Sequence, residues 1–251
     1  MAEARVTYVG HATVLLELGG VRLLTDPLLR SRVGPLRRQG QPPAPEVSRG
    51  IDAVLVSHLH HDHADLTSLR RLGREVRLLV PPGARRFFER RRFADVTELA
   101  PGETARVGEV EVTAVEARHE VGKRRFAPSS EPVGFLLDGP RRVYFAGDTD
   151  LFEGMSGWGQ DLDLALLPIW GWGPSLGEGH LDPERAARAA ALLAPRLAVP
   201  IHWGTFYPLG LARFRRGPLQ APPQEFVEWV RKLAPQTEPL VLAPGEATSL
   251  A

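Results

Sequence analysis

The sequence predicts an α/β fold with layered, mixed β-sheets. Short apolar segments typical of strands alternate along the 251 residues with segments of helical periodicity, and β-hairpins accompany this alternation. Alternation packs helices against sheets, while hairpins add antiparallel strands to sheets that are otherwise parallel. No shift in composition marks a boundary, so we expect residues 1–251 to form one domain.

The first half of the chain supplies a hairpin and then alternating elements. Gly19 and Gly20 form the expected turn of the hairpin. Residues 30–49 are rich in Pro, Gly and Arg and are interpreted as a loop. The segment DAVLVS has the continuous apolar run of a strand buried on both faces. The other expected strands are RVTYVGH, TVLLEL, VRLLTDP, VRLLVPP and VEVTAVEA, and the expected helices are LTSLRRL and GARRFFERRRF.

The second half begins with another hairpin and contains the clearest helix. The segment PVGFLLDGPRRVYFAGDT is expected to turn at its DGP tripeptide. In DPERAARAAALLAP, Asp182 has the character of an N-cap and Pro183 occupies the first helical position. The remaining expected strands are DLALLPI, LAVPIHW and PLVLA, and the last expected helix is PPQEFVEWVRKLAP.

The composition excludes several classes of protein. The chain has no cysteine, which excludes disulfides and thiolate metal ligands. Its 31 Lys and Arg against 30 Asp and Glu give a net charge of +1, so no nucleic-acid partner is expected. The sequence has no apolar run of the ~18 residues that a membrane span needs and no signal-peptide core, which predicts a cytoplasmic protein. Abundant Pro and Arg with scarce Lys and Met favour a thermophilic source.

A cluster of histidines is the clearest functional signal. The segment VSHLHHDHAD, residues 56–65, holds four of the eight histidines of the chain. Imidazole is the commonest metal ligand in proteins, and an open catalytic site needs about three protein ligands. The four candidates of this segment are too many for one open site and too few for two: His58, His60, Asp62 and His63. A two-metal site therefore requires ligands from elsewhere.

Three further candidates follow expected strands. His119, Asp148 and His202 each come at the end of an apolar segment, where α/β sheets place their sites. We therefore expect two ligand sets, one with His58, His60 and His119 and the other with Asp62, His63 and His202. Asp148 has two carboxylate oxygens and is the expected bridge between the metals.

At this point a family resemblance is clear. The segment SHLHHDHAD resembles the H-x-H-x-D-H signature of the metallo-β-lactamase superfamily, and His119, GDT and PIHW resemble its later metal-binding motifs. The resemblance implies a four-layer αβ/βα sandwich, with two mixed β-sheets flanked by helices and a dinuclear site at one edge. It also implies hydrolysis, because the redox-active di-iron branch typically has Glu at the position of His60. Two zinc ions are the expected cofactors, and an N/O ligand set also accepts Mn or Fe.

Two more segments indicate a branch of the superfamily. GHATVLLELGGVRLLTDP and GHLDPERAARAA resemble the branch with N-acylphosphatidylethanolamine-hydrolysing phospholipase D and ascorbate-6-phosphate lactonase. The His-x-x-Pro-Glu motif of this branch places a histidine near the active site, which here is His180. His180 also lies just before an expected helix N-terminus, a position that favours anions. The structural alternative for His180 is a supporting or capping role.

Substrate contacts are expected from two loops. Lys123 and Arg124 follow His119 closely and could face a phosphate oxygen, although a solvated loop is the favoured alternative. Trp170 and Trp172 lie in a Gly-rich loop and could wall an apolar pocket, as could the aromatic residues of HWGTFYP. APSSEP stands where the family often has a polar motif with Asn, so substrate contacts are not carried over from the family.

Supporting residues are expected around the ligands. Asp26 resembles a family residue that holds metal ligands from behind, a role that fixes imidazole tautomers. His11 either lines the site and, like Asp26, supports the metal ligands from behind, or is a buried structural histidine. His61, between two candidate ligands, is expected to point away from the metals.

The expected mechanism is metal-dependent hydrolysis. Two metals share a hydroxide, which attacks phosphorus or a carbonyl carbon. Asp62 and Asp148 are the expected catalytic carboxylates, and His180 is expected to bind the substrate anion or protonate the leaving group. A small-molecule or lipid-like anionic phosphodiester is the first substrate class, and the family branch also predicts a homo-oligomer.

Other functions remain open from the sequence. The main alternative is a lactonase or carboxylic ester hydrolase acting on a phosphorylated sugar acid. A nuclease is less favoured, because family nucleases add a clamp domain or exosite. A non-catalytic metal-binding module is also less favoured, because it predicts loss of a ligand, whereas all seven candidates are present.

Overall fold

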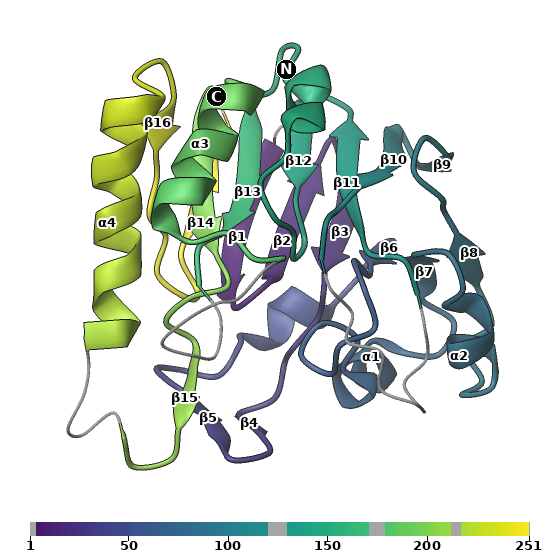
Figure 1. The fold of residues 1–251 in the computed structure, drawn as a ribbon. Coiled ribbons are helices and arrows are strands. Elements are labelled where there is room, and N and C mark those ends of the chain that lie inside the picture. Colours follow the sequence, from purple (N-terminus) through teal and green to yellow (C-terminus); the bar gives the residue numbers. More distant parts are fainter. Residues whose placement is uncertain (1–3, 120–129, 171–178, 212–216, 251) are drawn as a thin grey trace.

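The fold is given by a computed structural model, which describes residues 4–119, 130–170, 179–211 and 217–250. Two seven-stranded mixed sheets lie face to face, and helices cover their outer faces (Figure 1). This is the αβ/βα sandwich that the family resemblance implied.

The first sheet has the strand order β17-β1-β2-β3-β6-β7-β8. Its first four strands pair antiparallel, and β3, β6, β7 and β8 continue the sheet in parallel. The register is regular except for a bulge between Tyr8 and Gly10, directly before His11. The strands are β1 (Ala4–Gly10), β2 (Thr13–Leu18), β3 (Val21–Thr25), β6 (Ala53–Leu55), β7 (Arg77–Val80), β8 (Val96–Glu98) and β17 (Ala247–Ser249).

The second sheet has the order β16-β14-β13-β12-β11-β10-β9. The hairpins β9-β10-β11-β12 are antiparallel, and β12, β13, β14 and β16 run parallel. The strands are β9 (Thr104–Val107), β10 (Val110–Glu116), β11 (Val133–Asp138), β12 (Val143–Phe145), β13 (Leu164–Pro168), β14 (Leu197–Ile201) and β16 (Glu238–Pro239).

Three layers of apolar contact hold the sandwich together. Side chains from the facing sides of both sheets form the central core, with Leu16 and Phe135 among its fully buried members. The helices α1 (Leu66–Leu72) and α2 (Arg85–Glu89) pack on the outer face of the first sheet. The helices α3 (Pro183–Leu193) and α4 (Gly217–Leu233) pack on that of the second. Burial of apolar area is the main driving force for this arrangement.

Residues 30–49 contain more regular structure than the loop expected from sequence. They form β4 (Arg32–Val33), β5 (Leu36–Arg38) and a 3-10 helix, η1 (Pro45–Ser48). β5 pairs with β15 (Phe206–Pro208) to give a small three-stranded sheet of order β15-β5-β4. The expectation was incomplete because these strands are short and their pairing partner lies far along the chain.

The chain end also differs from the sequence-based prediction. α4 begins at Gly217, so Pro222 and Pro223 lie inside it rather than at its start. Of the expected closing strand PLVLA, only Pro239 is in a strand, and β17 near the C-terminus completes the first sheet instead. A second 3-10 helix, η2 (Glu153–Trp158), was not expected.

The start of α3 agrees with the sequence. The side chain of Asp182 accepts a hydrogen bond from the backbone N–H of Arg185 at 2.8 Å, and Pro183 is the first residue of α3. Asp65 caps α1 in the same way, accepting from the Ser68 backbone and hydroxyl at 2.9 and 2.7 Å. In the described part of the chain, no helix combines the length and the apolar character needed to cross a membrane.

Asp65 stands in the histidine-rich segment, yet its contacts are those of a helix cap, together with an ion pair to Arg30 at 3.1 Å. We expect Asp65→Ala to lower the free energy of unfolding by about 1 kcal/mol, because it removes the cap. Asp65→Asn retains a capping oxygen and should recover most of that loss. Urea unfolding measures both variants, with Thr67→Ala on the exposed face of α1 as control. Loss of bound metal in Asp65→Asn would contradict a capping role.

Candidate metal centre

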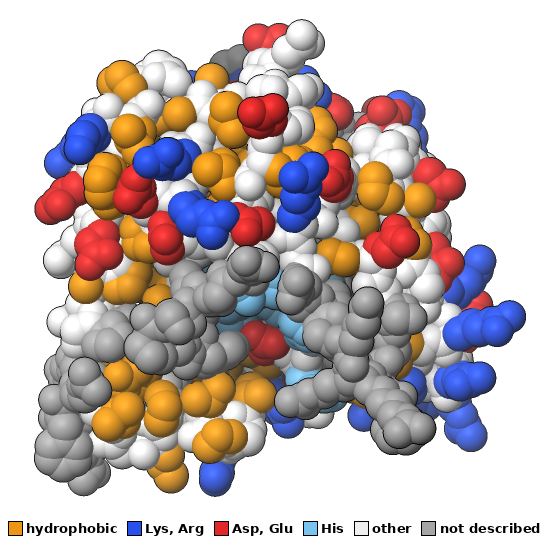
Figure 2. Space-filling view, in the orientation of Figure 1, with side chains coloured by type: hydrophobic (Ala, Val, Ile, Leu, Met, Phe, Trp, Pro, Cys, Tyr) orange, Lys and Arg blue, Asp and Glu red, His pale blue; other side chains and the backbone are white. Residues whose placement is uncertain are grey.

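The candidate ligands meet at one edge of the sandwich, where several strands end. His58, His60, Asp62 and His63 lie in the turn between β6 and α1. The other three come from the second sheet: His119 follows β10, Asp148 follows β12 and His202 follows β14. Histidine side chains line a hollow on this face, with a carboxylate among them (Figure 2).

The first predicted ligand set is compact. The distance from His58 Nε2 to His60 Nδ1 is 2.9 Å, and that from His119 Nε2 to His60 Nδ1 is 3.2 Å. Two nitrogens on a tetrahedral zinc ion lie about 3.3 Å apart, because each Zn–N bond is about 2.0–2.1 Å long. Three converging nitrogens at this spacing therefore fit one metal ion.

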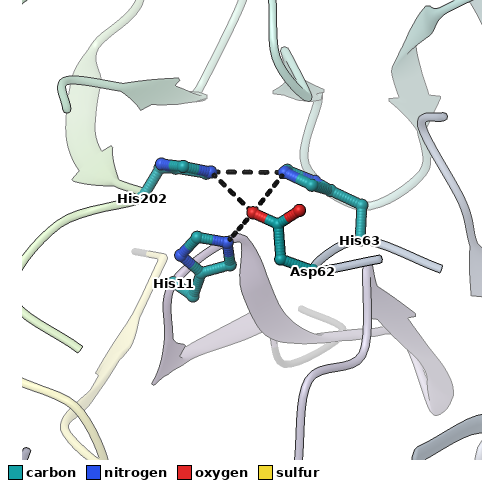
Figure 3. A group of neighbouring side chains, drawn as sticks. All are labelled: His11, Asp62, His63 and His202. Atoms are coloured by element: carbon teal, nitrogen blue, oxygen red, sulfur yellow. Dashed lines mark hydrogen bonds and ion pairs between the residues drawn. The ribbon is translucent and has the colours of Figure 1, made fainter. Parts of the chain in front are cut away.

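The second predicted set lies beside the first. His63 Nε2 and His202 Nε2 are 3.2 Å apart, and Asp62 Oδ2 lies 3.6 and 3.8 Å from them (Figure 3). Asp148 reaches the same nitrogens, with Oδ2 3.3 Å from His63 and Oδ1 3.6 Å from His202. A carboxylate oxygen of Asp148 also lies within 4.8 Å of a ring nitrogen of His119, which belongs to the first set. Its carboxylate therefore lies between the two sets, as expected for a bridge.

Four of the five candidate histidines have a partner on the ring nitrogen that points away from the centre, whereas His60 directs its Nδ1 toward His58 and His119. His63 Nδ1 lies 2.7 Å from Asp26 Oδ2, and His58 Nδ1 lies 3.0 Å from the Ser57 hydroxyl. Two backbone carbonyl oxygens accept from the remaining rings: Gly179 from His119 Nδ1 at 2.8 Å, and Trp170 from His202 Nδ1 at 2.6 Å. Protonation at Nδ1 leaves the Nε2 lone pair directed at the centre, so the donor set fits metal ions.

Asp26 connects these supports. Its Oδ2 accepts from the Ser57 hydroxyl at 2.6 Å as well as contacting His63, and its Oδ1 accepts from the Ser57 backbone at 2.8 Å. Ser57 was not singled out from the sequence, although it directly precedes the first candidate ligand. The signal was too general, because serine is frequent at strand ends.

Electrostatics keep the first set neutral. Burial, and then repulsion from neighbouring histidines, lowers the pKa of His58 and lowers the pKa of His60 to about 4. Burial also lowers the pKa of His119. Neutral imidazole is the form that binds a metal.

The second set carries charge. Burial opposes ionisation of Asp62 and Asp148, but attraction from His63 and His202 outweighs it, and the pKa of both carboxyls lies well below the usual range. Burial likewise opposes charge on His63 and His202, and the two carboxylates raise the pKa of both imidazoles. A metal ion bound by His63 and His202 would therefore have to displace protons from their Nε2 atoms.

His11 makes two hydrogen bonds with the second set and one with Thr205. Its Nε2 lies 2.9 Å from Asp62 Oδ2, the oxygen that faces His63 and His202 (Figure 3). Its backbone oxygen accepts from the His202 N–H at 2.7 Å, and its own N–H donates to the Thr205 hydroxyl at 2.7 Å. Burial, then repulsion from His202, lowers the pKa of His11 to about 3, so the ring is neutral and its Nε2–H donates to the carboxylate.

His180 lies beside the first set. Its ring is edge-on to that of His119, with centroids 4.7 Å apart. A ring nitrogen of His180 also lies within 4.8 Å of possible ligand atoms of His119 and Asp148. Asp150 holds this loop, because it accepts from the Gly179 N–H at 3.1 Å and forms an ion pair with Arg185 at the start of α3. The role of Asp150 was not found from the sequence, because its partners lie about 30 residues away.

The other predicted residues separate into three groups. His61 is exposed and, among the described residues, belongs to none of the groups that could hold a metal. The aromatic residues after His202 pack inward: Phe206 and Tyr207 are buried, and Trp203 stacks on Tyr8. Three predicted substrate residues lie outside the described residues: Lys123, Arg124 and Trp172.

Close packing at Gly147 ties the Asp148 loop to the metal-binding turn. Gly147 has φ +60°, and a Cβ there would lie 2.5 Å from Ser57 Cβ. Only glycine allows the two loops to approach this closely without strain.

Comparison with known proteins identifies the family. The sequence profile of the beta-lactamase superfamily domain matches residues 21–203. The chain belongs to the metallo-β-lactamase superfamily. It is 32% identical to a UPF0173 metal-dependent hydrolase of Methanopyrus kandleri, over 97% of this chain and 98% of that protein. Its structure resembles that of a metallo hydrolase from Ignicoccus hospitalis, with a TM-score of 0.75 and 26% identity over 99% of both chains. Both of these proteins are named as metal-dependent or metallo hydrolases.

Two longer relatives match over most of this chain. An uncharacterized Mycobacterium tuberculosis protein is 34% identical over 80% of this chain, which spans 59% of the relative. An N-acyl-phosphatidylethanolamine-hydrolyzing phospholipase D of Caenorhabditis elegans is 31% identical over 83% of this chain, which spans 65% of the relative. The chain therefore covers less than two thirds of either relative.

The contacts of His11 predict an effect on one metal. We expect His11→Leu to weaken metal binding by the set that contains Asp62 about 10–100-fold, because Asp62 loses a hydrogen-bond donor. His11→Gln can still donate an N–H and should retain most of the affinity. Chelator competition with metal analysis measures both variants, with exposed His61→Leu as control. Unchanged affinity for both metals in His11→Leu would refute the effect.

The contact at Gly147 predicts a loss of stability. We expect Gly147→Ala to lower the free energy of unfolding by about 1–3 kcal/mol, because the new methyl group overlaps Ser57. Gly34→Ala is a matched control, since Gly34 has φ +53° and open space around it. Thermal and urea unfolding compare the two variants, and equal losses would assign the effect to backbone strain alone.

Proposed function

We propose that this protein is a dinuclear metal-dependent phosphodiesterase. The observation that carries the proposal is the pair of ligand sets joined by Asp148. Asp148 lies within reach of His63 and His202 on one side and of His119 on the other. One carboxylate between two groups of converging donors fits two ions better than one.

The residues present fit divalent metals with nitrogen and oxygen ligands, and zinc is the first choice. His58, His60 and His119 would hold one ion, and Asp62, His63 and His202 the other, with Asp148 shared. Two such ions supply a nucleophile from water at neutral pH and stabilise negative charge on the reacting group. Mn and Fe remain alternatives, because no ligand type in the set excludes them.

The protein groups have separate tasks in this proposal. Asp62 and Asp148 are ionised and can orient a water molecule by accepting its hydrogen bonds. His180 lies beside His119 at the edge of the centre, where its ring can donate a hydrogen bond to a phosphate oxygen or a proton to the leaving oxygen. Asp150 acts as a positioning residue, because it fixes the backbone directly before His180.

One observation favours a phosphodiester over a carboxylic ester, and a second favours an anionic substrate. The relative from Caenorhabditis elegans is named as a phospholipase D, whose bond class is a phosphodiester. The N-terminus of α3 follows His180 by three residues, and helix N-termini attract anionic groups. Together they support an anionic, phosphate-containing substrate.

The test uses bis(p-nitrophenyl) phosphate with zinc-loaded, manganese-loaded and chelator-treated protein. We expect metal-dependent turnover that Asp62→Ala lowers by at least about 100-fold, because it removes a ligand and a catalytic carboxylate. His61→Ala is the control within the same turn, since His61 is exposed.

His180→Ala separates the proposed role of that residue from metal binding. It should lower kcat on the phosphodiester by about 10²–10⁴-fold if it is the general acid, with two metals still bound. Lactone turnover without phosphodiester turnover, in protein that holds two metals, would overturn the proposal in favour of a lactonase.

A further inference from the structure

The small sheet beside the metal centre ends in an exposed apolar tip, which we call the β15–β5 tip (residues 32–37 and 206–211). Leu209 is 60% exposed and Leu211 is 38% exposed. Among the described residues, the other large hydrophobic side chain with such exposure is Leu192, on α3. Orange side chains gather over this region, below the histidine-lined hollow (Figure 2). Clustered exposure of this kind marks an interaction surface.

The same region is basic. The described residues 27–45 contain four arginines and neither Asp nor Glu. The whole chain is close to neutral at +1, so this concentration is local. The four arginines are Arg30, Arg32, Arg37 and Arg38.

Two of these arginines extend from the tip itself. Arg32 and Arg37 are exposed and stand opposite each other in the β4–β5 register. Arg30, by contrast, pairs with Asp65 at 3.1 Å, and Arg38 is buried against backbone carbonyls. Like charges directly opposite in a hairpin repel each other. An anionic partner at the tip would relieve that repulsion.

The combination of leucine and arginine selects among possible partners. A second copy packed through a two-fold interface would bring this patch against itself, and its arginines would repel. Nucleic acid would satisfy the arginines but leave the leucines in water. An anionic lipid surface accepts both, because leucine enters the acyl boundary while arginine contacts the headgroups.

We propose that the β15–β5 tip docks the protein on anionic lipid surfaces. The tip is joined directly to the metal centre, because β15 begins four residues after His202. The Gln39 N–H donates to the Thr205 oxygen at 2.7 Å, which fixes the tip to the same loop. Docking there would place the metal-binding edge of the sandwich near the lipid headgroups. The proposal is independent of the reaction, since binding is measured without turnover.

The test is sedimentation of full-length protein with vesicles of equimolar phosphatidylcholine and phosphatidylglycerol, compared with pure phosphatidylcholine. We expect binding to the anionic vesicles that high salt weakens. R32Q/R37Q should weaken it about 30-fold, at about fivefold for each arginine. L209S/L211S should weaken it at least about tenfold. The matched controls are R49Q and L192S, exposed residues outside the tip, which should bind like the wild type.

Two outcomes would overturn the proposal. One is the absence of vesicle binding, with light scattering showing a wild-type oligomer that L209S/L211S dissociates; the tip is then a contact between copies. The other is binding of single-stranded DNA that depends on Arg32 and Arg37 but not on the leucines, without vesicle binding. Thermal unfolding of each variant checks that the fold is retained.

Discussion

The buried carboxylate of Asp26 is the contact on which the metal centre depends. It is fully buried, and burial raises its pKa, yet two hydrogen bonds from Ser57 and a third with the His63 imidazole hold it in place. Through Ser57 it reaches His58 of one ligand set, and directly it reaches His63 of the other. A polar group buried this deeply is costly unless every partner is present, so its network fixes one geometry. The rest of the site is built outward from that fixed point.

The two sheets contribute to the centre in different ways. The first sheet delivers four candidate ligands in one turn, along with Asp26 and His11 from neighbouring strand ends. The second sheet delivers single ligands from three strands, so its register decides whether they meet the turn. Gly147 shows how tight that meeting is, since the Asp148 loop approaches Ser57 without room for a methyl group. The candidate ligands therefore meet only when the two sheets are correctly packed against each other.

Local sequence patterns predicted α/β layers with mixed sheets, and the family resemblance implied the sandwich. The candidate ligands could be selected because they are also marked locally. Apolar runs define the strands, and each candidate ligand follows such a run by a few residues. What the sequence did not predict depends on contacts between distant segments. The hydrogen bond from His11 to Asp62 joins residues 51 apart, and that between Gly179 and Asp150 joins residues 29 apart. The pairing of β5 with β15 is equally non-local, and each strand has only three residues. Periodicity in such short segments carries too little information.

Charge links the metal centre to its surroundings. On the proposed function, two divalent ions bring four positive charges, while Asp62 and Asp148 return two negative ones. His11, His58, His60 and His119 have lowered pKa values and add none. Even with Asp26 counted as a third carboxylate, the two ions would leave an excess of positive charge at the floor of the hollow, which favours anionic groups there. The exposed Arg32 and Arg37 of the β15–β5 tip extend the same preference to the outer surface. An anionic amphiphile would therefore meet attraction along its whole approach, first at the tip and then at the metals.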